Sequence, residues 1–335
     1  MKKEVFFLFS ILIIILSSCS INRFATRLVA DALSSGEGGS VFTSDNDPEF
    51  IATALPFALK TFESLLKSDP ENLGLLESTS SGYISYANAF LQSPAEVMEY
   101  DEIEKKEHLL SRAASMYRRG AAFADRGLDI LYPGFKSLFD TADWSLAFKY
   151  LNSDAVPFLY WKAAAILGEF SVDSFNPELM LKVPYAFALI VRALELDEDY
   201  NQGSLHDLMI AVNGNIPVSL IYLADDREKE YSVLNVLENY YSSRGVSYDT
   251  MTSVDFVKFH LNLSVILSND TKASPYVSAS VIYIKSQDYT AFKSILDKAI
   301  NIDSDINPDN RLVNIISKQK ALWLLDHAED YFFEL

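Results

Sequence analysis

The chain has 335 residues but only one cysteine, Cys19, and this scarcity excludes several kinds of site. A lone cysteine cannot form a disulfide within the chain, so the fold has to be stabilised by packing. Because Cys19 lies in a targeting segment described below, no thiol remains for a nucleophile or for a zinc–thiolate centre.

Histidine and glycine are also sparse, and neither occurs in a catalytic pattern. No HExxH or paired metal spacing connects the four histidines, which are His108, His206, His260 and His327. The run Gly36–Gly39 lacks the Lys-Ser/Thr pair and the preceding strand of a phosphate-binding loop. The segment Asp303–Asn307 begins like a calcium loop, but Pro308 occupies the place of its glycine. The sequence therefore predicts no metal site, no cofactor and no enzymatic activity.

Basic residues are outnumbered, with 28 Lys and Arg against 46 Asp and Glu, for a net charge of −18. Such a chain is repelled by nucleic acid and by anionic lipid surfaces, so nucleic acid is excluded as a partner. Hydrophobic residues make up 49% of the sequence, enough for a large core.

The N-terminus has the pattern of an export signal. Lys2 and Lys3 precede an apolar run from Val5 to Leu16, which ends in Leu16-Ser17-Ser18-Cys19. The run is shorter than the roughly 20 residues that span a bilayer, which makes a permanent membrane anchor the weaker alternative. We interpret residues 1–18 as a lipoprotein signal peptide.

Cys19 is the expected lipidation site. It would carry a diacylglycerol and an amide-linked acyl chain such as palmitate, and two or three chains hold a protein stably on a membrane. The alternative is an ordinary small residue at a cleavage site. Residues 19–47 are predicted to form a lipidated N-terminus, a short helix and a Gly-rich linker facing the periplasm. Since Ser20 is not the Asp that favours inner-membrane retention, the outer membrane is slightly preferred.

The region 48–335 is predicted to be all-α. Apolar residues recur at spacings of three and four, between breakers such as Asp69-Pro70, in segments that we expect to be helices. These segments are Phe50–Lys67, Gly74–Leu91, His108–Leu131, Val156–Phe170, Pro184–Leu196, Leu205–Val212, Glu228–Tyr241, Val254–Leu267, Thr290–Ile302 and Leu312–Phe332. The segment Pro275–Ile284 is compatible with a strand or a buried helix.

Several helix ends share a pattern of small and bulky residues. Small residues let two helices approach to about 8–10 Å, as in tetratricopeptide hairpins. The pattern occurs at Ala58, Phe62 and Leu65, at Ala113, Tyr117 and Gly120, at Ala186, Ile190 and Ala193, and at Phe292, Leu296 and Ala299. Generic helix packing is the alternative. We predict degenerate tetratricopeptide-like helical hairpins in a compact superhelix.

Aromatic residues cluster in two places, around Trp144 and in Phe158–Trp161. Helical repeats curve and expose a concave surface, which such side chains can line. The alternative is that they pack in the core between helices.

Two segments carry a family resemblance. Ala155–Ala165 places a Tyr-Trp pair before an alanine run, and Arg192–Tyr200 ends a helix with Leu-Asp and a following Tyr. His206 follows one turn into the next helix. In these features the chain resembles the TatT family, the tetratricopeptide-like lipoprotein components of tripartite ATP-independent periplasmic (TRAP) transporters, over nearly all of its mature length.

The resemblance implies a homotrimer that docks the periplasmic solute-binding protein of a TRAP system and relays a small hydrophobic or carboxylate-bearing ligand. It places Tyr160, Trp161 and His206 near an inner cleft, where His206 could supply a charge for a carboxylate. Adjacent helical residues point about 100° apart, so we expect Tyr160 to face the cleft and Trp161 to pack. The competing hypothesis is a structural lipoprotein adaptor that binds protein partners in envelope assembly.

Overall fold

The computed structural model describes residues 41–217, 220, 228 and 230–333. Within these ranges the chain is helical and contains no strand, which confirms the all-α prediction. The predicted signal peptide, Cys19 and the short helix after it lie outside the described residues. Residues 41–43, near the end of the predicted linker, are helical, and the long helices begin at Pro48 as expected.

The first half of the chain forms long helices joined by short ones. In order these are α3 (Pro48–Ser68), α4 (Leu73–Tyr86), α5 (Ser93–Glu96), α6 (Ile103–Leu131), α7 (Phe135–Asp140), α8 (Trp144–Phe148) and α9 (Val156–Val172). A π-helical segment, Ala87–Gln92, links α4 to α5. The sequence pattern predicted α3, α4, α6 and α9, but not the short α5, α7 and α8.

The second half continues with shorter elements. They are α10 (Pro177–Met180), α11 (Val183–Leu196), α12 (Tyr200–Asn215), α14 (Val233–Ser242), α15 (Ser253–Leu267), α16 (Ser274–Ala279), α17 (Val281–Lys285), α18 (Tyr289–Asn301), the 3₁₀ turn η5 (Pro308–Asn310) and α19 (Arg311–Asp326). The ambiguous segment Pro275–Ile284 is helical and is divided between α16 and α17 at Ser280.

Side-chain caps explain where several helices begin. The Asp47 carboxylate accepts a hydrogen bond from the Phe50 amide at the start of α3. At the start of α4 the side-chain oxygen of Asn72 accepts one from the Leu75 amide. Thr252 and Asp255 form a reciprocal capping box at the start of α15. Each cap satisfies backbone N–H groups that the first turn of a helix leaves without partners.

Helices α4, α6, α9 and α11 lie side by side, each contacting the next. Close approach requires small residues at the crossings. A Cβ atom added to Gly127 of α6 would lie 2.3 Å from the Phe158 ring of α9. The small residues of the predicted repeat pattern at Ala113, Ala186 and Ala299 are fully buried, as helix contact points should be.

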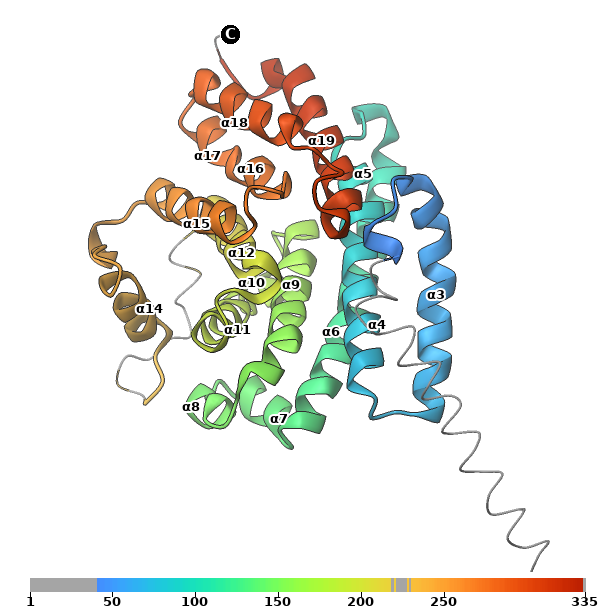
Figure 1. The fold of residues 1–335 in the computed structure, drawn as a ribbon, viewed down its shortest axis with the longest axis vertical. Coiled ribbons are helices and arrows are strands. Elements are labelled where there is room, and N and C mark those ends of the chain that lie inside the picture. The colour runs from blue at the N-terminus through green and yellow to red at the C-terminus, as the bar shows by residue number, and fades with distance from the viewer. Residues whose placement is uncertain (1–40, 218–219, 221–227, 229, 334–335) are drawn as a thin grey trace, which may run out of the picture.

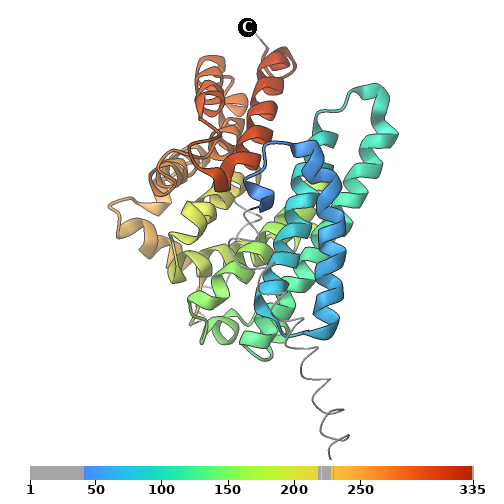
Figure 2. The same cartoon turned by 45° about the vertical axis from the view of Figure 1, so that its right-hand side comes forward.

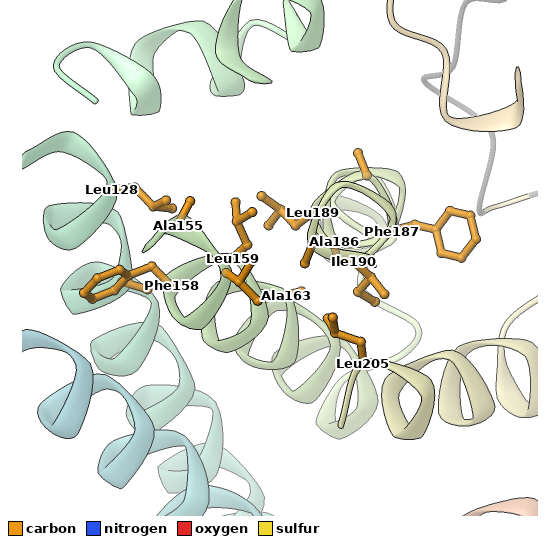
Figure 3. Packing of buried hydrophobic residues seen from close by; sticks show 14 of the residues in the cluster. Leu128, Ala155, Phe158, Leu159, Ala163, Ala186, Phe187, Leu189, Ile190 and Leu205 are labelled. Carbon is orange, nitrogen blue, oxygen red and sulfur yellow. The ribbon is translucent and has the colours of Figure 1, made fainter. Parts of the chain in front are cut away.

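The largest core cluster runs from α3 to α15, and Figure 3 shows its centre around α9 and α11. Leu159 of α9, Leu189 of α11 and Leu205 of α12 are completely buried there. A second cluster fills the space among α16, α18 and α19. Aromatic side chains contribute to both clusters. This agrees with the alternative that the aromatic residues pack in the core between helices.

The two ends of the described chain meet. The Arg311 guanidinium at the start of α19 donates a hydrogen bond to the Ser44 carbonyl oxygen at 2.8 Å. Further along α19, Lys320 forms an ion pair with Glu96 of α5 at 2.5 Å. The two views show α19 beside the end of the α3–α5 region, so the helices curl back towards their own beginning.

Candidate functional site

Three aromatic side chains meet where α9 lies against the start of α12. The rings of Tyr160 and Trp161 are 4.8 Å apart in an edge-to-face arrangement. The Tyr160 ring also lies 5.4 Å from the ring of Tyr200. All three residues are partly exposed, so they form an aromatic group that solvent can reach from at least one side. We call Tyr160, Trp161 and Tyr200 the aromatic trio.

The predicted division of Tyr160 and Trp161 between surface and core is not seen in their exposure, which is intermediate for both. The two side chains instead pack against different parts of the interior. Tyr160 contacts the large core cluster, and Trp161 contacts a small cluster formed by residues such as Ile84 and Tyr117. Both faces of α9 are covered here because α4 and α6 lie on one side and α11 and α12 on the other.

The hydroxyl groups of Tyr160 and Tyr200 are in a poorly solvated, acidic environment. Burial raises the pKa of Tyr160, the charge of Asp207 raises it further, and the Ser204 hydroxyl opposes the shift. Burial also raises the pKa of Tyr200, and the next contribution is the charge of Glu77. Both phenols therefore stay protonated at physiological pH and can donate hydrogen bonds.

Glu77 of α4 carries the carboxyl group whose charge acts on Tyr200. Burial raises its pKa above the ordinary value for a glutamate. In the described part of the chain no hydrogen bond or ion pair to its side chain is found. A partly buried carboxyl group whose charge acts on Tyr200 can accept a hydrogen bond when ionised, or donate one when protonated.

Tyr200 is followed by three residues in the left-handed region of backbone conformation. The φ angles are 45° at Asn201, 57° at Gln202 and 79° at Gly203. Each non-glycine residue in this region costs about 1–3 kcal/mol, and such strain is retained where the surrounding structure enforces it. The regular part of α12 begins only after this left-handed turn, close to the predicted start at Leu205.

Lys272 holds the left-handed turn in place. Its ammonium group donates to the carbonyl oxygens of Asn201 at 2.9 Å and Gln202 at 3.0 Å, and to the Ser204 hydroxyl at 3.0 Å. It also lies 3.3 Å from the Asp207 carboxylate. The lysine residue is only 6% exposed, so its charge is compensated entirely by these groups.

The turn is also tied to the C-terminal helices. The Gln202 side-chain oxygen accepts hydrogen bonds from the amides of Asn307 and Asn310, both in or next to η5. Asp207 accepts a further bond from the Ser264 hydroxyl of α15. The residues after Tyr200 are therefore fixed by elements that lie far apart in the sequence.

His206 lies on the buried side of α12 and has no exposed surface. Its Nδ1 atom is 2.8 Å from Nδ1 of His260 on α15. Its Nε2 atom is 3.4 Å from a carboxylate oxygen of Glu198, without the alignment of a hydrogen bond. In this conformation the ring offers no surface to a ligand, in contrast to the expectation that it would supply a charge inside the cleft.

A chain of hydrogen bonds continues from the histidine pair. The Tyr241 hydroxyl lies 2.6 Å from Nε2 of His260, which is also fully buried. At the other end, Glu198 accepts hydrogen bonds from Tyr240 and Arg244, each at 2.5 Å. The pKa of Glu198 is lowered to about 2, chiefly by His206 and then, against the effect of burial, by Tyr240 and Arg244.

The protonation state of His260 follows from its environment. Burial lowers the pKa of His260 well below its ordinary value, with smaller effects from His206 and Arg244, so His260 is neutral. If Tyr241 donates to Nε2 of His260, then Nδ1–H of His260 donates to Nδ1 of His206.

Trp144 does not join the trio. It lies on α8, is 3% exposed, and packs edge-to-face on Tyr185 with ring centroids 5.7 Å apart. Its indole N–H is buried and makes no hydrogen bond within the described ranges. Of the residues predicted from the sequence, the structure thus brings the rings of Tyr160 and Trp161 together, buries His206 completely on α12, and places Trp144 on α8.

Glu77, Lys272 and His260 were not predicted as site residues from the sequence. Tyr200 was part of the quoted helix-end pattern, but nothing in the sequence marked it as a neighbour of Tyr160. No local signal identifies the other three, because each reaches the site from a helix or loop distant along the chain. Across the described residues there is no group of three or more His, Cys, Asp or Glu side chains arranged to hold a metal ion.

Comparison with known proteins gives two similarities. The family model described as "TRAP transporter T-component" matches residues 44–220 and 233–332. An uncharacterized protein of Treponema pallidum (strain Nichols) is 28% identical over 305 residues, which cover 90% of this chain and 85% of that protein. The match to the family model includes the positions of the aromatic trio, the left-handed turn and the histidine pair.

Proposed function

The chain belongs to the TRAP transporter T-component family, and we propose that it docks the solute-binding protein of its TRAP system and receives or relays a small ligand at the aromatic trio. Membership of the family supports a role in TRAP transport and an association with the cell envelope. Docking and ligand binding are the finer steps that we infer.

The observation that supports a ligand site is the strained turn beside partly exposed aromatic rings. The left-handed residues Asn201 and Gln202 are held by a buried lysine, and strain of this kind tends to occur where a binding surface needs a fixed shape. The turn fixes Tyr200 against Tyr160. Rigid aromatic side chains bind apolar groups at a low cost in conformational entropy.

The polar groups around the trio suit a ligand with one polar end. Glu77 has a raised pKa and can share a proton with a ligand carboxylate, while the hydroxyls of Tyr160 and Tyr200 can donate hydrogen bonds. A hydrophobic or carboxylate-bearing solute of small size matches this combination. His206 has no exposed surface, so it would not touch the ligand.

Membrane attachment is the second part of the proposal. Among the helices that the structure describes, none is both long and apolar enough to cross a bilayer. We infer that a lipid on Cys19 anchors the protein at the periplasmic face of a membrane, with the outer membrane preferred. By family resemblance the anchored protein is a homotrimer.

Co-purification tests docking. The full chain, tagged at its C-terminus and extracted in an uncharged detergent, should capture the solute-binding protein whose gene lies beside TRAP membrane-subunit genes in the same genome. A binding protein for an unrelated solute is the control and should not be captured. Capture of neither would favour the adaptor hypothesis, in which the helical repeats bind other envelope proteins.

A further inference from the structure

A hollow on the outer side of the molecule has a charge opposite to that of the whole chain. It measures about 560 Å³ and lies between α3 and α6. Lys60 and Lys67 from α3 and Arg119 and Arg126 from α6 line it, together with a single carboxylate, Glu63. Acidic residues outnumber basic ones in the sequence by 46 to 28, so four cations around one carboxylate is a marked local reversal.

Two of the cations are held against aromatic rings. The Arg119 guanidinium lies 5.8 Å from the centre of the Tyr83 ring, and that of Arg126 lies 5.5 Å from the centre of the Phe123 ring. These two rings are nearly parallel, with centres 6.0 Å apart. An aromatic contact restrains a guanidinium and leaves part of its N–H edge available to an anion.

The one carboxylate that lines the hollow, that of Glu63, already has hydrogen-bond partners. Glu63 accepts hydrogen bonds from the Tyr83 hydroxyl and from Lys60. Arg126 uses part of its hydrogen-bonding capacity on the Pro70 carbonyl oxygen, at 2.9 Å. In the part of the chain that the structure describes, no carboxylate forms an ion pair with Lys67, Arg119 or Arg126.

A neighbouring face of α6 provides a comparison. A second hollow, of about 720 Å³, is lined there mainly by residues of α6, α7, α9 and α11. Its cations are largely neutralised, since Arg118 pairs with Glu169 at 2.8 Å and Lys162 pairs with Asp125. Uncompensated positive charge is therefore concentrated on the side of α6 that faces α3.

From this geometry we propose that the hollow between α3 and α6 is a binding site for a phosphate-bearing anion. A carboxylate would neutralise one of the three cations without a carboxylate partner, whereas a phosphate group carries a charge of about −1.5 to −2 near neutral pH. Arginine side chains can also bind phosphate oxygens in a bidentate manner. The phosphate can belong to a soluble compound or to an anionic phospholipid headgroup, which share this chemistry.

Isothermal titration calorimetry on the full chain in dodecyl maltoside tests the proposal with two probes. The first is inorganic pyrophosphate. The second is phosphatidylglycerol mixed into the micelles, with phosphatidylcholine as its neutral counterpart. The matched variants are Arg119→Gln and Arg118→Gln, which remove equal charge from adjacent exposed residues of α6 that line different hollows. Lys67→Gln gives a second, independent loss of charge on α3.

We expect Arg119→Gln and Lys67→Gln each to weaken binding of the effective probe by roughly tenfold or more, and Arg118→Gln to leave it within about twofold. Binding of pyrophosphate would identify a soluble ligand, and binding of phosphatidylglycerol alone a lipid headgroup. No binding of either probe, or equal weakening by Arg118→Gln, would overturn the proposal. It would also be overturned if neither probe binds and Arg119→Gln abolishes capture of the solute-binding protein, because the hollow would then be a protein-docking surface.

Discussion

Nδ1 of His206 lies 2.8 Å from Nδ1 of His260, and neither imidazole ring is exposed to solvent. Two nitrogens at this distance share one hydrogen, so one ring donates and the other accepts. The pair joins α12 to α15 and, through Tyr241 and Glu198, to α14 and the end of α11. The network thereby links side chains of α12, α14 and α15 with the end of α11.

The first prediction concerns acid stability. The folded-state pKa of His260 lies well below its unfolded value of about 6.5. Between these two pKa values the unfolded chain binds more protons than the folded one, so the free energy of unfolding should fall as pH drops below about 6.5. Urea unfolding midpoints measured from pH 7.5 to pH 5 should show this decrease, and His260→Gln should reduce its slope.

Glu198 contributes in a lower pH range. Its pKa is about 2 in the folded state, so the stability that it provides is present above its ordinary pKa and is lost as pH falls from about 4.5 towards 2. The His260→Gln comparison should therefore be made above pH 5, where Glu198 remains ionised in both states. A wild-type midpoint that does not change between pH 7.5 and pH 5 would contradict the assignment of a neutral, buried His260.

The second prediction concerns the left-handed turn. Lys272→Met removes the ammonium group that compensates Asp207 and binds the carbonyls of Asn201 and Gln202. Removing one partner of a buried ion pair typically costs about 3–5 kcal/mol. We expect a loss of this size in the free energy of unfolding in urea. Lys293→Met, at an exposed lysine with an i,i+4 partner, should change it by less than about 0.5 kcal/mol and serves as the control.

The third prediction concerns the ligand. Tyr160→Ala and Glu77→Gln should each weaken binding of a hydrophobic carboxylate, for which the fluorescent probe cis-parinaric acid is suitable, by roughly tenfold or more. Since Tyr160 and Trp161 are only partly buried, neither Tyr160→Ala nor Trp161→Ala should cost the full ~3–5 kcal/mol of a buried aromatic deletion. Trp144→Ala, at a buried residue outside the trio, should reduce stability without a specific effect on the probe. Unchanged probe affinity in Tyr160→Ala and Glu77→Gln would contradict a site at the trio.

The fourth prediction concerns the anchor. Cys19→Ala should accumulate as uncleaved or mislocalised precursor, because the thioether bond requires the cysteine sulfur. Phase separation in Triton X-114, together with labelling by radioactive palmitate, measures this. If the variant is processed normally and still enters the detergent phase, lipidation at Cys19 is wrong.

Much of the fold could be predicted because it is encoded locally. The segment from Val156 to Phe170 repeats apolar residues every three or four positions, and α9 extends over Val156–Val172. Helices α7 and α8 were missed because five or six residues are too few to show a helical period. The left-handed turn at Asn201 and Gln202 was missed because neither residue carries the strong turn signal of glycine or proline, and distant groups enforce the conformation.

The site could not be predicted in the same way, because its contacts join residues that lie far apart in the sequence. His206 and His260 are 54 positions apart, and Lys272 reaches back to a turn about 70 residues before it. The periodicity that predicts helices leaves the pairing of their faces undetermined. The family resemblance led to Tyr160 and Trp161, which do lie together, but it could not show that His206 faces inwards.

Sedimentation velocity of the full chain in detergent, alone and with its cognate solute-binding protein, tests the central claim most directly. The account predicts that the chain sediments as a homotrimer and that the binding protein, added in excess, shifts the boundary to a larger complex. The shift should be lost when an unrelated solute-binding protein replaces the cognate one. A strictly monomeric chain that leaves the cognate binding protein sedimenting at its own rate would contradict the account and favour the adaptor hypothesis.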